Sequence, residues 1–134
     1  MRVVIDTNVL VAAAYAPGSA SRRIVEACIA GDLTPLASQT VRREYETILA
    51  RAVRVEGYDR RLAAFLGQLT SVEPAETPRV VPEDPEDDKF LAAAVAGDAA
   101  WLVTNDRHVL SIRQHRDVRI GTPAKFADEV LDAD

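Results

Sequence analysis

Apolar residues occur along this chain in two patterns, short unbroken runs and longer segments in which they recur every three or four positions. Residues 2–6 form the first run, in which three consecutive β-branched aliphatic side chains precede an acid. An unbroken run of this kind is typical of a central parallel strand that is covered on both faces. By the same reasoning we predict further strands at residues 33–37, 71–73, 101–103 and 118–121.

The segments between these runs have the periodicity of amphipathic helices. Residues 38–53 are the clearest case, because Ser38 can cap the helix and one stripe is apolar, formed by Val41, Tyr45, Ile48, Leu49 and Ala52. Residues 74–85 carry four prolines and predict a surface loop, at the end of which Asp84 can cap a helix with Pro85 in its first position. We predict the other helices at residues 9–15, 19–30, 59–69, 84–96, 106–113 and 122–131.

Strands that alternate with helices throughout indicate an α/β fold with a mainly parallel sheet and helices on both faces. The chain has 134 residues, so we predict a single domain over residues 1–134. Ligands of such folds bind beyond the carboxyl ends of the strands. The sequence contains neither GxGxxG nor GxxxxGK[ST], which argues against dinucleotide and P-loop chemistry.

Composition and charge narrow the function classes. The sequence is 48% hydrophobic, and no apolar run approaches the roughly 20 residues that a membrane helix needs. Its single cysteine, Cys28, excludes an intramolecular disulfide, so we expect a cytoplasmic protein without membrane contact. The net charge of −5 argues against non-specific coating of DNA. It does not argue against a metal-dependent nuclease, whose active site concentrates carboxylates.

Two predicted strands of the sheet are followed by an aspartate. Asp6 ends the first run, and the amide of Asn8 could orient its carboxylate; Asp106 follows residues 101–103 within Thr104-Asn105-Asp106. Each aspartate alone could be a helix N-cap. Two strand ends of one parallel sheet can instead bring two carboxylates together, which is costly unless a cation neutralises them.

Three further acids are candidates on predicted helices. Glu44 flanks the apolar stripe of its helix, where it either snorkels to solvent or has a function. Asp87 and Asp88 both lie in the first turns of their helix, and periodicity does not choose between them. Favourable interaction with a helix N-terminus could explain both. Acids without a cysteine or histidine cluster favour a hard cation, Mg²⁺ or Mn²⁺, and such sites typically serve phosphoryl chemistry.

Four segments of the sequence carry a resemblance to a known family: Val4-Ile5-Asp6-Thr7-Asn8, Glu44, Asp88-Lys89-Phe90-Leu91-Ala92-Ala93-Ala94, and Leu102-Val103-Thr104-Asn105-Asp106. Together they resemble the PIN-domain family, in particular small bacterial and archaeal VapC-like toxins of toxin–antitoxin systems. The resemblance covers essentially the whole chain. In the family pattern an aspartate is followed by an apolar residue three positions on and by alanines further on. This pattern favours Asp88 over Asp87.

The resemblance implies a three-layer α/β/α sandwich with a mainly parallel central sheet. It implies a Mg²⁺ or Mn²⁺ site, with both metal-binding and catalytic roles, made by Asp6, Glu44, Asp88 and Asp106. Four other residues are expected to support these ligands: Asn8, Thr104, Asp84 and Asp87. The activity implied is that of a ribonuclease acting on single-stranded RNA.

The sequence thus predicts a Mg²⁺- or Mn²⁺-dependent endoribonuclease that hydrolyses phosphodiester bonds of RNA, the toxin of a toxin–antitoxin pair with a cognate antitoxin protein as partner. A homodimer is expected through the apolar faces of residues 19–30 and 38–53. One alternative is a Mg²⁺-dependent phosphatase of the haloacid-dehalogenase type, which would need a second aspartate where Asn8 stands. The other is a non-catalytic protein-binding module that keeps the fold.

Overall fold

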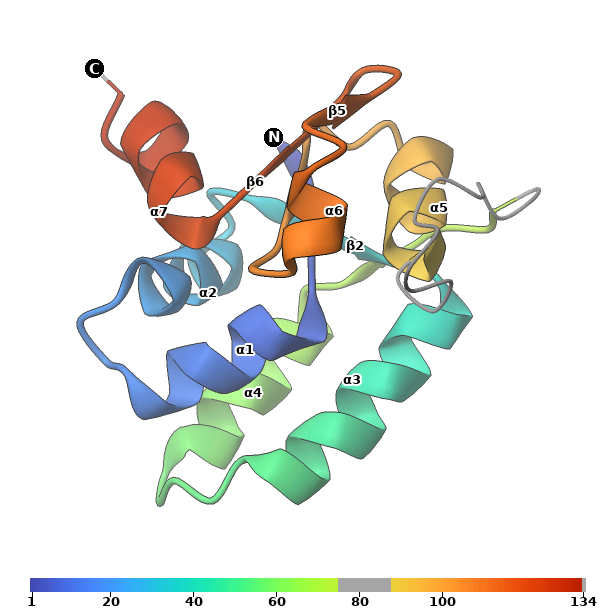
Figure 1. The fold of residues 1–134 in the computed structure, drawn as a ribbon. Coiled ribbons are helices and arrows are strands. Elements are labelled where there is room, and N and C mark those ends of the chain that lie inside the picture. The colour runs from blue at the N-terminus through green and yellow to red at the C-terminus, as the bar shows by residue number, and fades with distance from the viewer. Residues whose placement is uncertain (75–87, 134) are drawn as a thin grey trace.

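A mainly parallel sheet runs through the middle of the protein, as seen in a computed structural model that describes residues 1–74 and 88–133 (Figure 1). Within these residues the sheet has the strand order β3-β2-β1-β4-β6-β5. All neighbouring strands pair parallel except β5 and β6, which form an antiparallel pair at one edge. The strands are β1 (Arg2–Ile5), β2 (Thr34–Ala37), β3 (Thr70–Ser71), β4 (Trp101–Val103), β5 (Gln114–His115) and β6 (Val118–Gly121).

Helices cover both faces of the sheet, which confirms the predicted three-layer α/β/α architecture. Figure 1 shows α2 and α7 on one side of the sheet and α5 on the other. The helices are α1 (Thr7–Tyr15), α2 (Ala20–Ala30), α3 (Gln39–Ala52), α4 (Tyr58–Gly67), α5 (Asp88–Ala96), α6 (Arg107–Leu110) and α7 (Pro123–Phe126), which continues as a π-helical turn, η2 (Ala127–Leu131). No helix in the described part of the chain is long and apolar enough to cross a membrane.

Hydroxyl side chains begin three of these helices, at the positions where the sequence places a cap. Ser19, Ser38 and Thr122 each accept a hydrogen bond from the backbone N–H three residues further on. Such a bond satisfies one of the N–H groups that a helix leaves unpaired in its first turn. Gly31 ends α2 with φ of 88°, a left-handed conformation that glycine adopts without steric cost.

The core lies on both faces of the two central strands. The side chains of Val3, Val4 and Ile5 are at most 1% exposed, as expected for a parallel strand between two helical layers. On the α7 side, Trp101 packs edge-to-face against Phe126, with ring centroids 5.3 Å apart. Such aromatic pairs add specific geometry to the burial of apolar area. The central sheet is therefore a rigid base for the residues that follow its strands.

The structure corrects several predicted boundaries. Strand β5 was not predicted, because its two polar residues pair with β6 through the backbone and carry no hydrophobic pattern. Helix α1 begins at Thr7 instead of residue 9, since Asp6 caps it. Helix α6 ends at Leu110 instead of residue 113, and Arg113 takes a left-handed φ of 66°. The predicted helix start at Asp84 and most of the predicted loop lie outside the described residues.

Candidate active site at the carboxyl edge of the sheet

Asp6 and Thr104 lie side by side at the carboxyl edge of the sheet because β1 and β4 pair in register. Ile5 pairs with Val103, so the next residue of each strand reaches the same level. The backbone N–H of Asp6 donates to the carbonyl of Val103 at 2.9 Å. The Thr104 hydroxyl donates to Oδ2 of Asp6 at 2.8 Å, in a position where both side chains are buried. This fixes the carboxylate at the end of the first strand.

The same hydroxyl connects Asp6 with Asp106. Thr104 Oγ1 accepts a hydrogen bond from the backbone N–H of Asp106 at 3.0 Å. The Asp106 carboxylate caps α6, accepting bonds from the N–H groups of His108 at 2.8 Å and Val109 at 3.2 Å. One buried threonine therefore links the two aspartates that follow neighbouring strands.

Asp6 is also a helix cap, so the two interpretations of these aspartates hold together. Its Oδ1 accepts a hydrogen bond from the backbone N–H of Asn8 at 3.1 Å, and α1 starts at Thr7, directly after Asp6. The support that Asn8 gives therefore comes from its backbone, while its side chain is exposed. Capping aims each carboxylate along the start of a helix and holds it at the sheet edge.

Glu44 reaches this edge from α3. One of its carboxylate oxygens, Oε2, accepts a hydrogen bond from the hydroxyl of Thr7, and the other, Oε1, lies 2.7 Å from Nζ of Lys89. The neighbouring residue, Tyr45, donates its hydroxyl hydrogen to the backbone carbonyl of Ile5. Helix α3 is thus fastened to the end of β1 and the start of α1. Glu44 is therefore partly buried, and both its carboxylate oxygens have partners within the protein.

Burial dominates the electrostatics of Asp6. Its side chain is 5% exposed, and this desolvation raises the pKa of the carboxyl. The hydrogen bonds from Asn8 and Thr104 lower the pKa, while the negative charges of Glu44 and Asp106 raise it further. Glu44 and Asp106 therefore both act on Asp6 through space. A cation placed among them would lower the energy of the ionised state.

Asp88 is the first described residue of α5, and the backbone of this part of the helix lies near the same edge. Its neighbour Lys89 contacts Glu44, and α5 packs against β1 and β4. The side chain of Asp88, like residues Asp84 and Asp87, lies outside the described part of the structure. Among the side chains that are described, no three His, Cys, Asp or Glu are grouped closely enough to hold a metal ion.

The donor groups at this edge fit a hard cation. Asp6, Glu44 and Asp106 offer carboxylate oxygens, and Thr7 and Thr104 offer hydroxyls. Oxygen-only ligand sets are those that Mg²⁺ and Mn²⁺ prefer. No cysteine or histidine side chain that would favour a softer metal takes part in the contacts described above.

Sequence reasoning missed two members of this arrangement, Thr7 and Lys89. Thr7 lies between two residues that were singled out, so its place in the Asp6-Thr7-Asn8 segment was the available signal. Lys89 directly follows Asp88. Both act through contacts with Glu44 across 37 or more positions, and spacing along the chain does not reveal such contacts.

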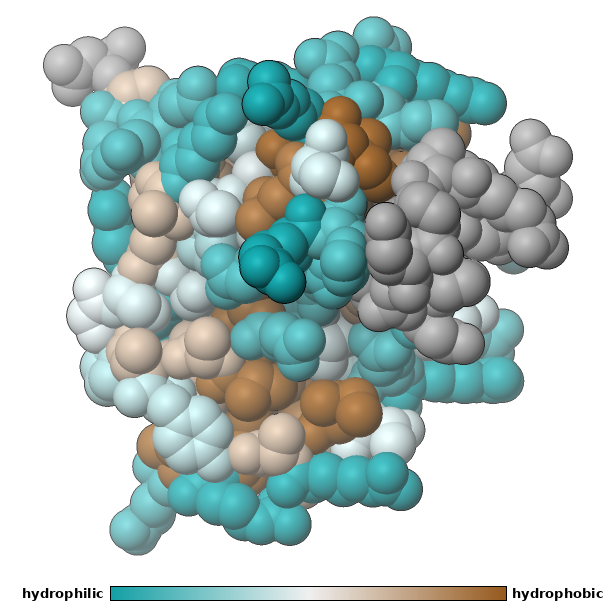
Figure 2. All heavy atoms as spheres, viewed as in Figure 1, coloured by the Kyte–Doolittle hydropathy of each residue, from teal (hydrophilic) through white to brown (hydrophobic). Residues whose placement is uncertain are grey.

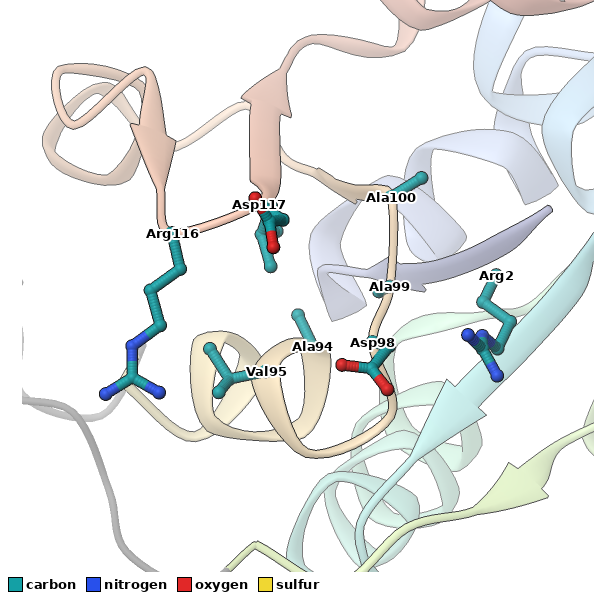
Figure 3. A pocket seen from close by; sticks show the side chains of 9 residues that line it. Arg2, Ala94, Val95, Asp98, Ala99, Ala100, Arg116 and Asp117 are labelled. Atoms are coloured by element: carbon teal, nitrogen blue, oxygen red, sulfur yellow. The ribbon is translucent and has the colours of Figure 1, made fainter.

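A cavity of about 650 Å³ lies at the opposite, amino edge of the sheet (Figure 3). Its charged lining residues are Arg2, Asp98, Arg116 and Asp117, two of each sign, and all four are exposed. None of the predicted acids lines it. This cavity is therefore separate from the candidate active site.

Comparison with known proteins places this arrangement in a family. The family model for the PIN domain matches residues 2–108, which include Asp6, Glu44, Asp88 and Asp106. The chain belongs to the PIN domain family. PIN domains are generally nucleases, and they generally use divalent metal ions.

Several individual proteins are similar to this PIN domain. The uncharacterised protein MJ1680 of Methanocaldococcus jannaschii is 23% identical, over 96% of this chain and 91% of its own length. The crystal structure of VapBC2 from Rickettsia felis, bound to a DNA fragment from their promoter, includes a chain with a TM-score of 0.59 and 19% identity. That match covers 90% of this chain and 97% of the other. The crystal structure of PAE2754 from Pyrobaculum aerophilum gives a TM-score of 0.56 and 21% identity. That match covers 99% of this chain and 100% of the other. At these identities the two structures establish the fold.

Proposed function

We propose that this PIN domain is a Mg²⁺- or Mn²⁺-dependent endoribonuclease that hydrolyses phosphodiester bonds of RNA. The observation that carries the proposal is the hydrogen-bonded link from Asp6 through Thr104 to Asp106. It gathers two acids at the sheet edge where parallel α/β folds bind their ligands. Family membership supports nuclease chemistry, and the oxygen-only donors support a hard cation.

In this proposal Asp6, Asp88 and Asp106 hold the cation, and Glu44 completes the acidic set from α3. Divalent cations in such sites activate water for attack and stabilise the developing charge on the leaving oxygen. Thr104 keeps Asp6 and Asp106 at a fixed separation, and Thr7 orients Glu44. The protein contributes positioned negative charge, held by hydroxyl groups before any cation or substrate arrives.

Purified protein incubated with RNA tests the activity. We expect cleavage of single-stranded and loop RNA with Mg²⁺ or Mn²⁺, and none with EDTA. The resemblance implies products with a 5′-phosphate and a 3′-hydroxyl. Release of phosphate from small phosphomonoesters without RNA cleavage would favour the haloacid-dehalogenase alternative. Absence of both activities would favour the non-catalytic binding module.

We propose in addition that the protein is the toxin of a toxin–antitoxin pair and acts in the cytoplasm. The fold it shares with a chain of the VapBC2 complex supports a cognate antitoxin as partner. Expression of the wild-type chain should arrest growth of a bacterial host, and the Asp6→Asn variant should not. Equal growth with both variants would argue against a toxin.

A homodimer is the further assembly that we propose. Helix α2 is a poor candidate for the interface, because Ile24, Val25 and Cys28 are buried within the monomer. The predicted stripe of α3 is also buried, at Val41, Tyr45 and Leu49, so we place the interface on other apolar surface of this helix. A groove of about 430 Å³ lies between α3 and α4, and Figure 2 shows apolar surface over α1 and α3. Light scattering at tens of micromolar should give twice the monomer mass of 14.6 kDa.

A further inference from the structure

The contact between Glu44 and Lys89 differs from the other ion pairs in how little solvent reaches it. The side chains of Lys89 and Glu44 are 16% and 27% exposed. In the other ion pairs between described residues, the side chains are 38–53% exposed. Exposed pairs contribute little because water and salt screen them. Among the ion pairs of the described residues, the Glu44–Lys89 pair is the least exposed to that screening.

This pair occupies a group that the proposed metal site would use. Oε1 of Glu44 contacts the ammonium group of Lys89, and Oε2 accepts the hydrogen bond from Thr7. Both oxygens are therefore engaged before a divalent cation arrives. A cation that binds Glu44 directly has to displace the ammonium group, and one that binds nearby is repelled by its positive charge.

We propose that Lys89 is a resident counter-cation of the acidic edge, which holds Glu44 in the metal-free protein and competes with the divalent cation for it. This inference rests on the proposed metal dependence. In the metal-free state the positive charge of Lys89 offsets the mutual repulsion of Glu44, Asp6 and Asp106. When the divalent cation binds, the same charge opposes it. Lys89 thus stabilises the empty site and weakens metal binding.

The chemistry of lysine suits this role. Its ammonium group is a compact charge on a flexible stem, so it can leave one carboxylate oxygen without breaking a fixed two-pronged contact. Its place in α5 brings the cation into the same helical turn as Asp88. The turn that supplies a predicted metal ligand therefore also supplies the competing charge.

Calorimetric titration of the full chain with Mn²⁺ tests the competition directly. We expect Lys89→Met, which keeps an unbranched side chain one atom shorter and without charge, to bind Mn²⁺ roughly three- to tenfold more tightly than wild type. Lys125→Met is the matched control, because it removes the same charge from the only other lysine, an exposed residue of α7. Its affinity should equal that of the wild type.

A metal-free measurement tests the ion pair independently. Lys89→Met should lower the melting temperature in EDTA, and the same substitution should lower it much less in a Glu44→Gln background. This double-mutant cycle isolates the interaction between the two side chains. If Lys89→Met fails to fold, Lys89→Gln in the same cycle provides the comparison.

The outcomes separate this inference from the proposed function. Wild-type cleavage with an Mn²⁺ affinity that Lys89→Met leaves unchanged or weakens would overturn the inference alone, as would additive effects in the cycle. Absence of Mn²⁺ binding and of RNA cleavage in both wild type and Lys89→Met would overturn both. Tighter Mn²⁺ binding by Lys89→Met together with non-additive melting temperatures supports the resident counter-cation.

Discussion

The two edges of the sheet both carry acidic side chains, and they differ in how those side chains are held. At the carboxyl edge, Asp6 is 5% exposed and is bonded to Thr104, which also binds the backbone of Asp106. At the amino edge, Asp98 and Asp117 are exposed, and the cavity they line is also lined by Arg2 and Arg116 (Figure 3). The cavity of about 650 Å³ lies at the edge where exposed charges of both signs face solvent.

Strand direction explains this difference better than cavity volume does. Parallel strands end at one common edge, and the helices that follow them begin there with unpaired N–H groups. Asp6 and Asp106 each satisfy such groups while lying next to a neighbouring strand end. The carboxyl edge therefore carries three acids, one of them buried, against the single positive charge of Lys89, which is an arrangement that favours a further cation.

The largest expected effect is on the rate of RNA cleavage, which should fall for variants at the carboxyl edge and not for variants at the amino edge. Asp6→Asn or Asp106→Asn should lower metal-dependent RNA cleavage by at least about 100-fold, because each removes a charged ligand while keeping the shape of the side chain. Asp98→Asn and Asp117→Asn at the amino edge should keep near wild-type rates. Cleavage rates on one RNA substrate at fixed Mg²⁺ give the comparison. A comparable loss at the amino edge would show that the active site has been assigned to the wrong end of the sheet.

Substitutions of the adjacent acids Asp87 and Asp88 test which of them belongs to the carboxyl-edge site. Asp88→Asn should lower cleavage to a similar extent, whereas Asp87→Asn should leave much of it. The reason is that the resemblance of residues 88–94 to the family pattern favours Asp88 over Asp87 as the ligand. Assaying both variants at saturating Mg²⁺ checks the prediction. The reverse result would mean that Asp87 is the ligand and that the match to the family pattern is off by one residue.

The sequence predicted the elements that burial and capping determine. Strands at residues 101–103 and 118–121 have the predicted bounds, and Ser19 and Ser38 cap the predicted helices. In each case the signal is local, an apolar run or a hydroxyl that precedes an amphipathic segment. Strand β5 had no such signal, because a two-residue edge strand is held by backbone bonds alone.

The candidate site was predictable to the extent that it follows strand ends. Asp6 and Asp106 could be paired from sequence, since parallel strands share an edge. Thr104 was expected to support the ligands, but the way its hydroxyl joins the two aspartates was not predicted, nor was the lysine that contacts Glu44. Those contacts depend on the register of β1 with β4 and on how α5 packs near α3. Side chains that meet only after packing leave no periodic pattern in the sequence.

Metal addition should stabilise the carboxyl edge by the next largest amount. A divalent cation that binds only the folded state at a hundredfold excess over Kd adds about 2.7 kcal/mol. For a domain of this size that corresponds to a rise in melting temperature of roughly 6–20 °C. Thermal scans with Mg²⁺ and with EDTA should show the rise in wild type and Asp117→Asn, and little of it in Asp6→Asn. An unmoved wild-type melting temperature would mean that these acids are caps only.

The hydroxyl link should have a smaller effect on stability. Thr104→Val keeps the shape of a fully buried side chain but removes the hydrogen bond to the Asp6 carboxylate and the acceptor for the Asp106 N–H. We expect a loss of about 2 kcal/mol in the free energy of unfolding. Urea denaturation measures it, with Thr47→Val on the exposed side of α3 as the control. Equal stability of the two variants would show that the link does not hold the edge together.

The smallest expected effect is a gain in stability that depends on pH. Burial raises the pKa of Asp6 in the folded protein above its ordinary value of 3.8, so ionisation of this carboxyl opposes folding. The stabilising contribution of its protonated form is complete below pH 3.8 and is lost as the pH rises through the folded-state pKa.

Asp6→Asn resembles the protonated form, so the metal-free variant should be the more stable protein at neutral pH. Its advantage should shrink as the pH falls through the folded-state pKa toward 3.8. Urea midpoints of both proteins in EDTA across this pH range measure the difference. An advantage that stayed constant with pH would attribute the gain to packing, and a destabilised variant at neutral pH would mean that the bonds from Thr104 and Asn8 outweigh the burial of the charge.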